Sequence, residues 1–192
     1  MFPTGGYTTS VDFYLDTADS PLLSDIRFDW SSAVNTPGGM HRRDFSFSVG
    51  TNGTGGFAVS ASNNSPGWPA NPLRDPLTIT TTGWYTLEHE FNDVAGVLSV
   101  DMSVLDANGT VLKTWTLSVP SDLIGTTVGG NRYGWIVVNA FTDLSLDNIT
   151  RSGAVASSAD DCKDGGWQSV FRSDGSAFKN QGDCMQYVNT GN

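Results

Sequence analysis

Hydrophobic and polar residues alternate with a period of two between Gly83 and Leu117, which is the pattern of half-buried β-strands. Within this segment Val100, Met102 and Val104 alternate with small polar residues. The run Asp106–Gly109 (Asp-Ala-Asn-Gly) then supplies a tight turn, because Asn and Gly tolerate the positive φ that hairpins require. The segment therefore predicts three consecutive antiparallel strands.

The pairing of the second and third of these strands can also be predicted. A turn at Asn108-Gly109 places Met102 opposite Trp115 and Val100 opposite Leu117. A four-residue turn would shift the partners by two residues and would leave every side chain on the same face. The assignment of faces therefore does not depend on the length of the turn.

The same alternation recurs on both sides of this ribbon, and Gly, Asn and Pro separate the segments. Further strands are predicted at 9–16, 25–30, 44–49, 57–61, 133–141 and 144–149. A long polar loop at 62–76 is broken by prolines, which cannot donate to a strand ladder, and a Gly-rich connection is predicted at 119–131. Short strands at this spacing are typical of sandwiches. The predicted fold class is all-β, a two-sheet antiparallel β-sandwich (jelly roll).

Composition narrows the possible partners. The chain has 192 residues, of which 38% are hydrophobic, and a formal net charge of −10. That charge disfavours nucleic acid and anionic lipid, and it is compatible with neutral glycans and cations. No run approaches the 18 or so apolar residues of a membrane span, and the start at Met1 shows no signal-peptide pattern.

The two cysteines, Cys162 and Cys184, lie close to the C-terminus. A disulfide between them would close a loop of about 20 residues and contribute about 3 kcal/mol of stability. Two free thiols in a cytosolic protein are the alternative, but low Lys and abundant Ser, Thr and Asn favour a secreted protein. We therefore predict a sandwich domain at 1–151, a linker at 152–161 and a disulfide-closed C-terminal tail at 162–192.

Aromatic residues are candidate stacking platforms for a sugar ring. Trp68 lies between Gly67 and Pro69 on the proline-stiffened loop, where it could instead serve as a loop anchor. The predicted ligand-binding residues are Trp68, Trp84, Tyr133 and Trp135.

Two carboxylates could support catalysis. Glu88 and Glu90 share one face of a strand, with Cα atoms about 7 Å apart. Their carboxyl groups can approach the separation of about 5–5.5 Å that retaining glycosidases use, and mutual repulsion would raise one pKa. Asp101, on the next strand and on the same polar face as Thr116, could join them. The alternative is a solvated acidic face.

Basic residues offer a second catalytic arrangement. In His41-Arg42-Arg43 an arginine could neutralise a uronate in a lyase, although ion pairs with acidic residues explain these arginines more simply. His89 lies among apolar neighbours, which favours a hydrogen-bonded core residue.

Acidic residues cluster near the first and the last predicted strands of the sandwich sequence. They suggest calcium, a hard cation that needs several oxygen ligands. The clusters are Asp12, Asp16 and Asp19, and Asp143, Asp147 and Asn148. First and last strands often neighbour each other in jelly rolls, so the clusters could meet. We predict Asp12, Asp16 and Asp147 as candidate Ca²⁺ ligands; solvated surface acids are the alternative.

Short motifs resemble known families over roughly residues 7–151. Gly83-Trp84-Tyr85-Thr86 with the following ribbon resembles laminin-G-like and concanavalin-A-like sandwiches, and residues 144–149 (LSLDNI) look like the last strand of carbohydrate-binding jelly rolls. That resemblance implies that Asp147 helps to hold a structural calcium ion. Laminarinase-type glucanases carry Glu-x-Asp-x-Glu, whereas Glu88-His89-Glu90 is two residues shorter and lacks the central Asp. The tail looks like a Cys-bracketed C-terminal appendage of secreted bacterial proteins.

These observations favour a secreted, extracellular, lectin-like glycan-binding module of bacterial origin, which calcium (Ca²⁺) could stabilise. Its predicted partner is a polysaccharide or other glycan, with no nucleic acid and no membrane span; the oligomeric state is not predicted. The alternatives are a glycan-cleaving enzyme (a glycoside hydrolase or polysaccharide lyase) that uses Glu88 and Glu90, and a structural or adhesive surface module.

Overall fold

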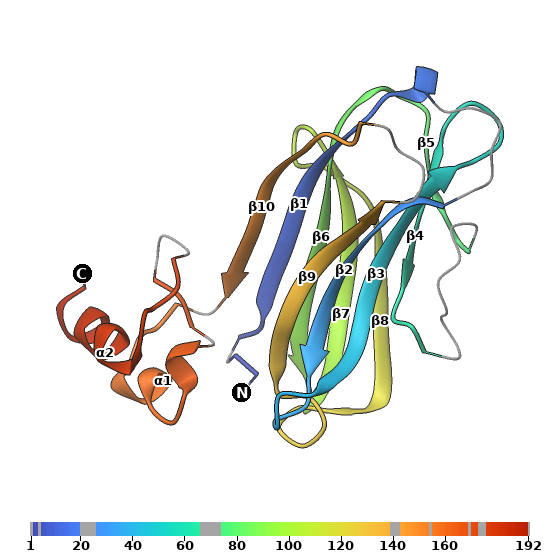
Figure 1. Cartoon of the computed structure of the whole chain (residues 1–192). Helices are drawn as coiled ribbons and strands as arrows, with labels where there is room; N and C mark the ends of the chain where they lie inside the picture. The colour runs from blue at the N-terminus through green and yellow to red at the C-terminus, as the bar shows by residue number, and fades with distance from the viewer. Residues whose placement is uncertain are drawn as a thin grey trace.

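Two five-stranded antiparallel sheets pack face to face in the computed structural model (Figure 1). The structure describes residues 2–3, 5–19, 26–65, 74–138, 143–153, 155–168, 170–172 and 176–191. The prediction of an all-β, two-sheet antiparallel sandwich is confirmed. The jelly-roll subtype stays a prediction.

The first sheet has the order β10-β1-β6-β7-β8, so the first and last strands of the chain are neighbours. Its strands are β1 (Tyr7–Leu15), β6 (Gly83–Val94), β7 (Val97–Asp106), β8 (Val111–Leu123) and β10 (Leu146–Gly153). The second sheet has the order β5-β4-β3-β2-β9. Its strands are β2 (Ile26–Asn35), β3 (His41–Thr51), β4 (Phe57–Ser62), β5 (Leu77–Ile79) and β9 (Gly130–Val138). A short 3₁₀ helix, η1 (Thr17–Asp19), follows β1.

The predicted register of the β7–β8 hairpin is confirmed. Val100 pairs with Leu117 and Met102 pairs with Trp115. Asp106 begins the turn: its backbone N–H donates to the carbonyl of Thr110 at 2.9 Å. Gly109 has a φ of 78°, the left-handed conformation that the turn chemistry predicted.

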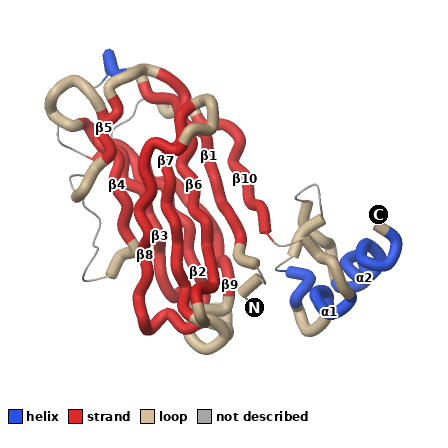
Figure 2. Tube along the Cα trace, turned by 180° about the vertical axis from the view of Figure 1, so that it is seen from behind, coloured by secondary structure: helices blue, strands red, loops and turns tan. Residues whose placement is uncertain are grey.

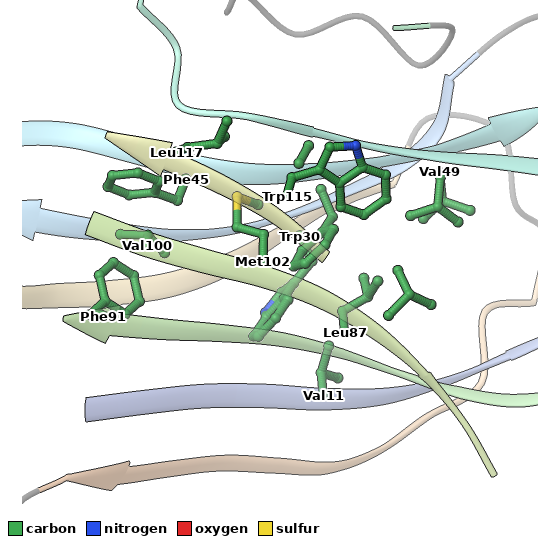
Figure 3. Packing of buried hydrophobic residues seen from close by; sticks show 14 of the residues in the cluster. Val11, Trp30, Phe45, Val49, Leu87, Phe91, Val100, Met102, Trp115 and Leu117 are labelled. Atoms are coloured by element: carbon green, nitrogen blue, oxygen red, sulfur yellow. The ribbon is translucent and has the colours of Figure 1, made fainter. Parts of the chain in front are cut away.

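The core lies between the two sheets, and Figure 3 shows part of its packing. Because side chains alternate, β1 and β6 send every second residue inward, as in the buried Val11, Leu87 and Phe91. From the second sheet Trp30 and Phe47 stack with ring centroids 6.2 Å apart. Burial of each large apolar side chain contributes about 1.5–3 kcal/mol, so burial of the inward-facing side chains favours the stacking of the two sheets.

Strand β8 is longer than the sequence indicated, because residues 119–123 continue it where a Gly-rich connection was predicted. The β8 strand lies at the edge of its sheet, where Pro120 removes no hydrogen bond to a further strand. An irregularity between Val97 and Ser99 absorbs the extra residues of β8. The short edge strand β5 also falls outside the predicted strands.

After β10 the chain forms a small helical unit, which we call the appendage (residues 155–191). It contains α1 (Ala159–Cys162), the 3₁₀ turn η2 (Gly166–Gln168) and α2 (Gln181–Thr190), and Figure 2 shows these helices beside the sandwich. None of the helices in the described ranges is long and apolar enough to cross a membrane. Helix α1 begins at Ala159, inside the predicted linker; the division into sandwich, linker and tail stays a prediction.

The disulfide between Cys162 and Cys184 is present and joins α1 to α2. Both cysteines are buried in a separate small core with Ala156, Val170 and Phe178. This cluster is too small to hold the helices by apolar burial alone, because small units usually need a covalent or metal staple. The disulfide is therefore the main element that stabilises the appendage.

A double variant, Cys162→Ala with Cys184→Ala, is expected to unfold the appendage and leave the sandwich folded. The disulfide spans a sequence separation of 22 residues, which corresponds to about 3 kcal/mol in the chain-entropy model. Hydrogen exchange should show loss of protection for the α2 amides and unchanged protection for β7 and β8. Persistent protection of α2 would contradict this expectation.

Candidate functional site

A pocket of about 380 Å³ opens on the first sheet where the β7–β8 turn meets β1, β6 and β10. Its polar and aromatic lining comes from four places in the sequence that the sheet order brings together. These residues are Asp12, Trp84, Thr86, Asp106, Asp147 and Asn148.

Trp84 forms the aromatic wall of this pocket. It lies on β6 directly opposite Tyr14 of β1, and the two rings meet edge to face with centroids 5.5 Å apart and an interplanar angle of 62°. The residue nevertheless keeps 41% of its surface exposed. The indole is therefore positioned by a neighbouring ring and is still accessible to a ligand.

Asp12 lies at the centre of a hydrogen-bond network. Its Oδ1 accepts from the hydroxyl of Thr86 at 2.6 Å, and its Oδ2 accepts from the side-chain amide of Asn148 at 2.8 Å. The backbone N–H of Asn148 donates to Asp147 Oδ1 at 2.8 Å. A register shift between Ser10 and Asp12 and the φ of 47° at Asn148 mark a local departure from regular pairing beside the pocket.

Asp106 brings a third carboxylate to the pocket from the hairpin turn. Its Oδ1 accepts from the backbone N–H groups of Asn108 at 2.8 Å and Thr110 at 2.9 Å. These two donors, first Thr110 and then Asn108, lower the pKa of Asp106 below its ordinary value. From the sequence Asp106 was predicted only as a turn residue and not as part of a site. It reaches the pocket because it pairs opposite Tyr85 on β6, and this register was not predicted.

The predicted calcium ligands are partly brought together. Asp12 and Asp147 are direct partners in the β1–β10 ladder, as the argument from neighbouring first and last strands anticipated. Asp16 instead accepts from Ala18 N at 2.9 Å and from the Thr82 hydroxyl at 3.2 Å, and it does not line the pocket. Within the described part of the chain, no three His, Cys, Asp or Glu residues form a group that could hold a metal. A calcium site stays a prediction.

Of the four predicted stacking residues, Trp84 lines the pocket. Trp68 lies outside the described residues. Tyr133 and Trp135 belong to β9, at the register positions opposite Ala33 and Ser31, and their side chains are outside the described part of the structure.

Glu88 and Glu90 lie on the polar face of β6, as predicted, but neither lines the pocket. Partial burial, and secondarily the charge of Glu90, raise the pKa of Glu88 above its ordinary value. Nearby, the Thr116 hydroxyl donates to Asp101 at 2.5 Å. None of the ion pairs among the described residues involves either glutamate. The catalytic role of this pair stays a prediction.

The basic residues have structural partners. Arg42 and Arg43 both pair with the buried Asp122, and His41 Nε2 lies 2.5 Å from Asp44 Oδ1. The simpler prediction for the arginines, an ion pair with an acid, is confirmed. His89 is fully buried, with its Nδ1 3.2 Å from the Thr9 hydroxyl, so it belongs to the core as predicted.

The fold and the pocket together define an all-β sandwich that carries an acidic pocket beside an exposed indole. No protein-family model matches the chain, and no curated protein matches it. Two solved structures are similar. One is the CBM2 module of the evolved Dit protein of Lactobacillus casei BL23 phage J-1, with 6% identity, a TM-score of 0.37, and 74% of this chain and 53% of that chain covered.

The other is the tail fiber protein gp63.1 of an E. coli phage, with 14% identity, a TM-score of 0.32, and 75% of this chain and 15% of that chain covered. The chain therefore spans about half the length of the first of these structures and a small part of the second.

Proposed function

We propose that this protein is a glycan-binding module and that the glycan binds in the pocket beside Trp84. The observation that carries the proposal is an exposed indole adjoining carboxylates and an amide in a single pocket. Such a combination suits a sugar ring, because the apolar C–H face stacks on the aromatic wall while the hydroxyls reach polar groups.

The polar groups support an orienting role. Carboxylate oxygens are acceptors and sugar hydroxyls are donors, so Asp12, Asp106 and Asp147 provide charge-assisted hydrogen bonds. Thr86 and Asn148 already hold Asp12 in place, so that little side-chain freedom is lost on binding. The pocket is therefore preorganised on its polar side.

The environment in which the module works is also part of the proposal. We place it outside the cell, because the Cys162–Cys184 disulfide suits an oxidising compartment. The structural or adhesive alternative predicts self-association and a glycan array without signals above background. The test below distinguishes it from glycan binding.

Trp84→Ala is expected to weaken glycan binding about 5-fold to 150-fold, because stacking on one aromatic ring contributes about 1–3 kcal/mol by analogy with nucleic-acid bases. The measurement is isothermal titration calorimetry with a glycan first found on an array. The thermal midpoint should change less than it would for a core tryptophan, since 41% of the surface of Trp84 is exposed.

The matched control is Met40→Ala, which removes a large side chain that is 72% exposed and does not line the pocket. It should bind the glycan as the wild type does. Equal affinities of wild type and Trp84→Ala would remove the proposed site.

A further inference from the structure

The pocket is strongly negative. Three carboxylates line it, those of Asp12, Asp106 and Asp147, and the described residues of its lining include no Lys, Arg or His. The cations on the strands of the first sheet are engaged elsewhere. Lys113 Nζ lies 2.7 Å from Asp75 Oδ1, and the Arg151 guanidinium lies over the Tyr7 and Phe171 rings at 5.3 and 4.7 Å. A ligand therefore meets uncompensated negative charge beside the indole.

Two of these carboxylates are direct neighbours across a strand pair. Asp12 on β1 is the register partner of Asp147 on β10, and like charges in that arrangement repel each other. Asn148 connects them, because its side-chain amide donates to Asp12 and its backbone N–H donates to Asp147. These hydrogen bonds hold the pair but add no positive charge. A cationic group in the pocket would offset the repulsion.

Negative charge continues along the same sheet beyond the pocket. Glu88 and Glu90 follow Thr86 on the polar face of β6, and Glu90 is paired with Asp101 on β7. The raised pKa of Glu88, caused by burial and by the charge of Glu90, is consistent with crowded negative charge on this face. A polymer that extends from the pocket along β6 would meet carboxylates at successive positions.

We propose that the pocket selects a sugar that carries a free ammonium group, and thus an amino-sugar glycan over its N-acetylated or uronic-acid counterpart. This inference rests on the proposed function. The carboxylates attract the ammonium group, and Trp84 adds a cation–π contribution because a cation close to an indole face is attracted by the ring quadrupole. The aromatic wall and the cavity define the site, and the acids define the charge of its ligand.

The test compares three β-1,4- or α-1,4-linked hexamers by calorimetry in mildly acidic, chelator-containing buffer, in which the amino groups of hexaglucosamine are protonated: hexaglucosamine, hexa-N-acetylglucosamine and hexagalacturonate. At 50 mM NaCl we expect hexaglucosamine to bind about tenfold more tightly than the N-acetylated hexamer, with hexagalacturonate the weakest. At 500 mM NaCl the ratio should shrink to about twofold or threefold, because salt screens partly exposed charges.

Asp12→Asn with Asp147→Asn should lower the ratio of the two affinities to about twofold at 50 mM NaCl. The matched control is Asp164→Asn, which removes the charge of an exposed appendage residue that does not line the pocket. This variant should keep the tenfold ratio of affinities. Trp84→Ala should weaken both hexamers.

Each outcome bears on a different statement. Equal binding of the amino and N-acetylated hexamers would overturn the inference and leave the proposed function standing. Binding of none of the hexamers, together with a blank glycan array, would remove both. A preference that appears only when calcium replaces the chelator would also overturn the inference, because the cation recognised at Asp12 and Asp147 would then be the metal.

Discussion

Replacement of Asp122 by alanine is expected to destabilise the sandwich by about 3–5 kcal/mol, because it would leave two arginines without their buried counter-ion. Asp122 is 1% exposed on β8 of the first sheet. Its Oδ1 accepts a hydrogen bond from Arg42 Nε at 2.8 Å, and the carboxylate also forms an ion pair with Arg43. Both arginines lie on β3 of the second sheet. The cluster therefore ties the two sheets together through one carboxylate. Urea denaturation followed by tryptophan fluorescence measures the loss.

Asp75→Asn is the matched control. Asp75 pairs with Lys113, which is also on β8, but 63% of its side chain is exposed. An exposed pair of this kind contributes about 0–1 kcal/mol. A loss below about 1 kcal/mol for Asp122→Ala, similar to that of the control, would show that the buried cluster does not hold the sheets.

Replacing all three members of the cluster by apolar residues separates the burial of charge from the loss of a partner. Substitution of a complete buried ion cluster by well-packed apolar residues is often neutral or stabilising. We therefore expect the triple variant Arg42→Met, Arg43→Leu and Asp122→Leu to be more stable than Asp122→Ala alone.

The sandwich and its central register could be predicted because both depend on local alternation. Val100 and Met102 had to face the core, and the turn at Asn108-Gly109 had to bring Leu117 and Trp115 opposite them. The end of β8 could not be read in the same way. The register irregularity beside Val97 follows no period in the sequence, and Asp122 is buried against Arg42 and Arg43, which are about 80 residues earlier in the chain.

The appendage helices were missed although local signals exist. Ser158 and Asp161 form a capping box at the start of α1, and Asn180 caps α2, which ends at Gly191 in the left-handed conformation. These signals are weak in the sequence because α1 has only four residues and the linker composition around it favours a loop. The helices also depend on the burial of Cys162 and Cys184 in the small core, which the local sequence does not predict.

The candidate pocket was predictable in part. The proximity of Asp12 and Asp147 follows from the pairing of first and last strands, and the exposure of Trp84 follows from alternation on β6. The position of Asp106 in the pocket depends on the pairing of β7 with β6, which was not predicted. The left-handed conformation of Asn148 is a local irregularity that the alternation of residues does not predict.

Low pH is expected to lower the free energy of unfolding of the sandwich because His89 is buried in its neutral form. Burial lowers the pKa of His89 from its ordinary value of 6.5 to about 3, so the folded protein keeps the ring neutral while the unfolded chain binds a proton. The unfolded state therefore holds more protons below pH 6.5. Above about pH 6.5 the buried ring of His89 does not lower the free energy of unfolding. As the pH falls from about 6.5 toward 3, the free energy of unfolding decreases by about 4–5 kcal/mol in total because of this residue.

The variant His89→Leu isolates this contribution, because leucine also suits the apolar surroundings formed by Trp30 and Phe47. The difference in unfolding free energy between wild type and His89→Leu should change by about 1.4 kcal/mol per pH unit between roughly pH 6 and 3, to the disadvantage of the wild type in acid. Asp29 and Glu88, whose pKa values are raised by burial, oppose the trend, but both are present in the wild type and in His89→Leu and cancel in the difference. Parallel curves for wild type and His89→Leu would mean that the buried ring takes up its proton without unfolding, and that the core at this point admits water.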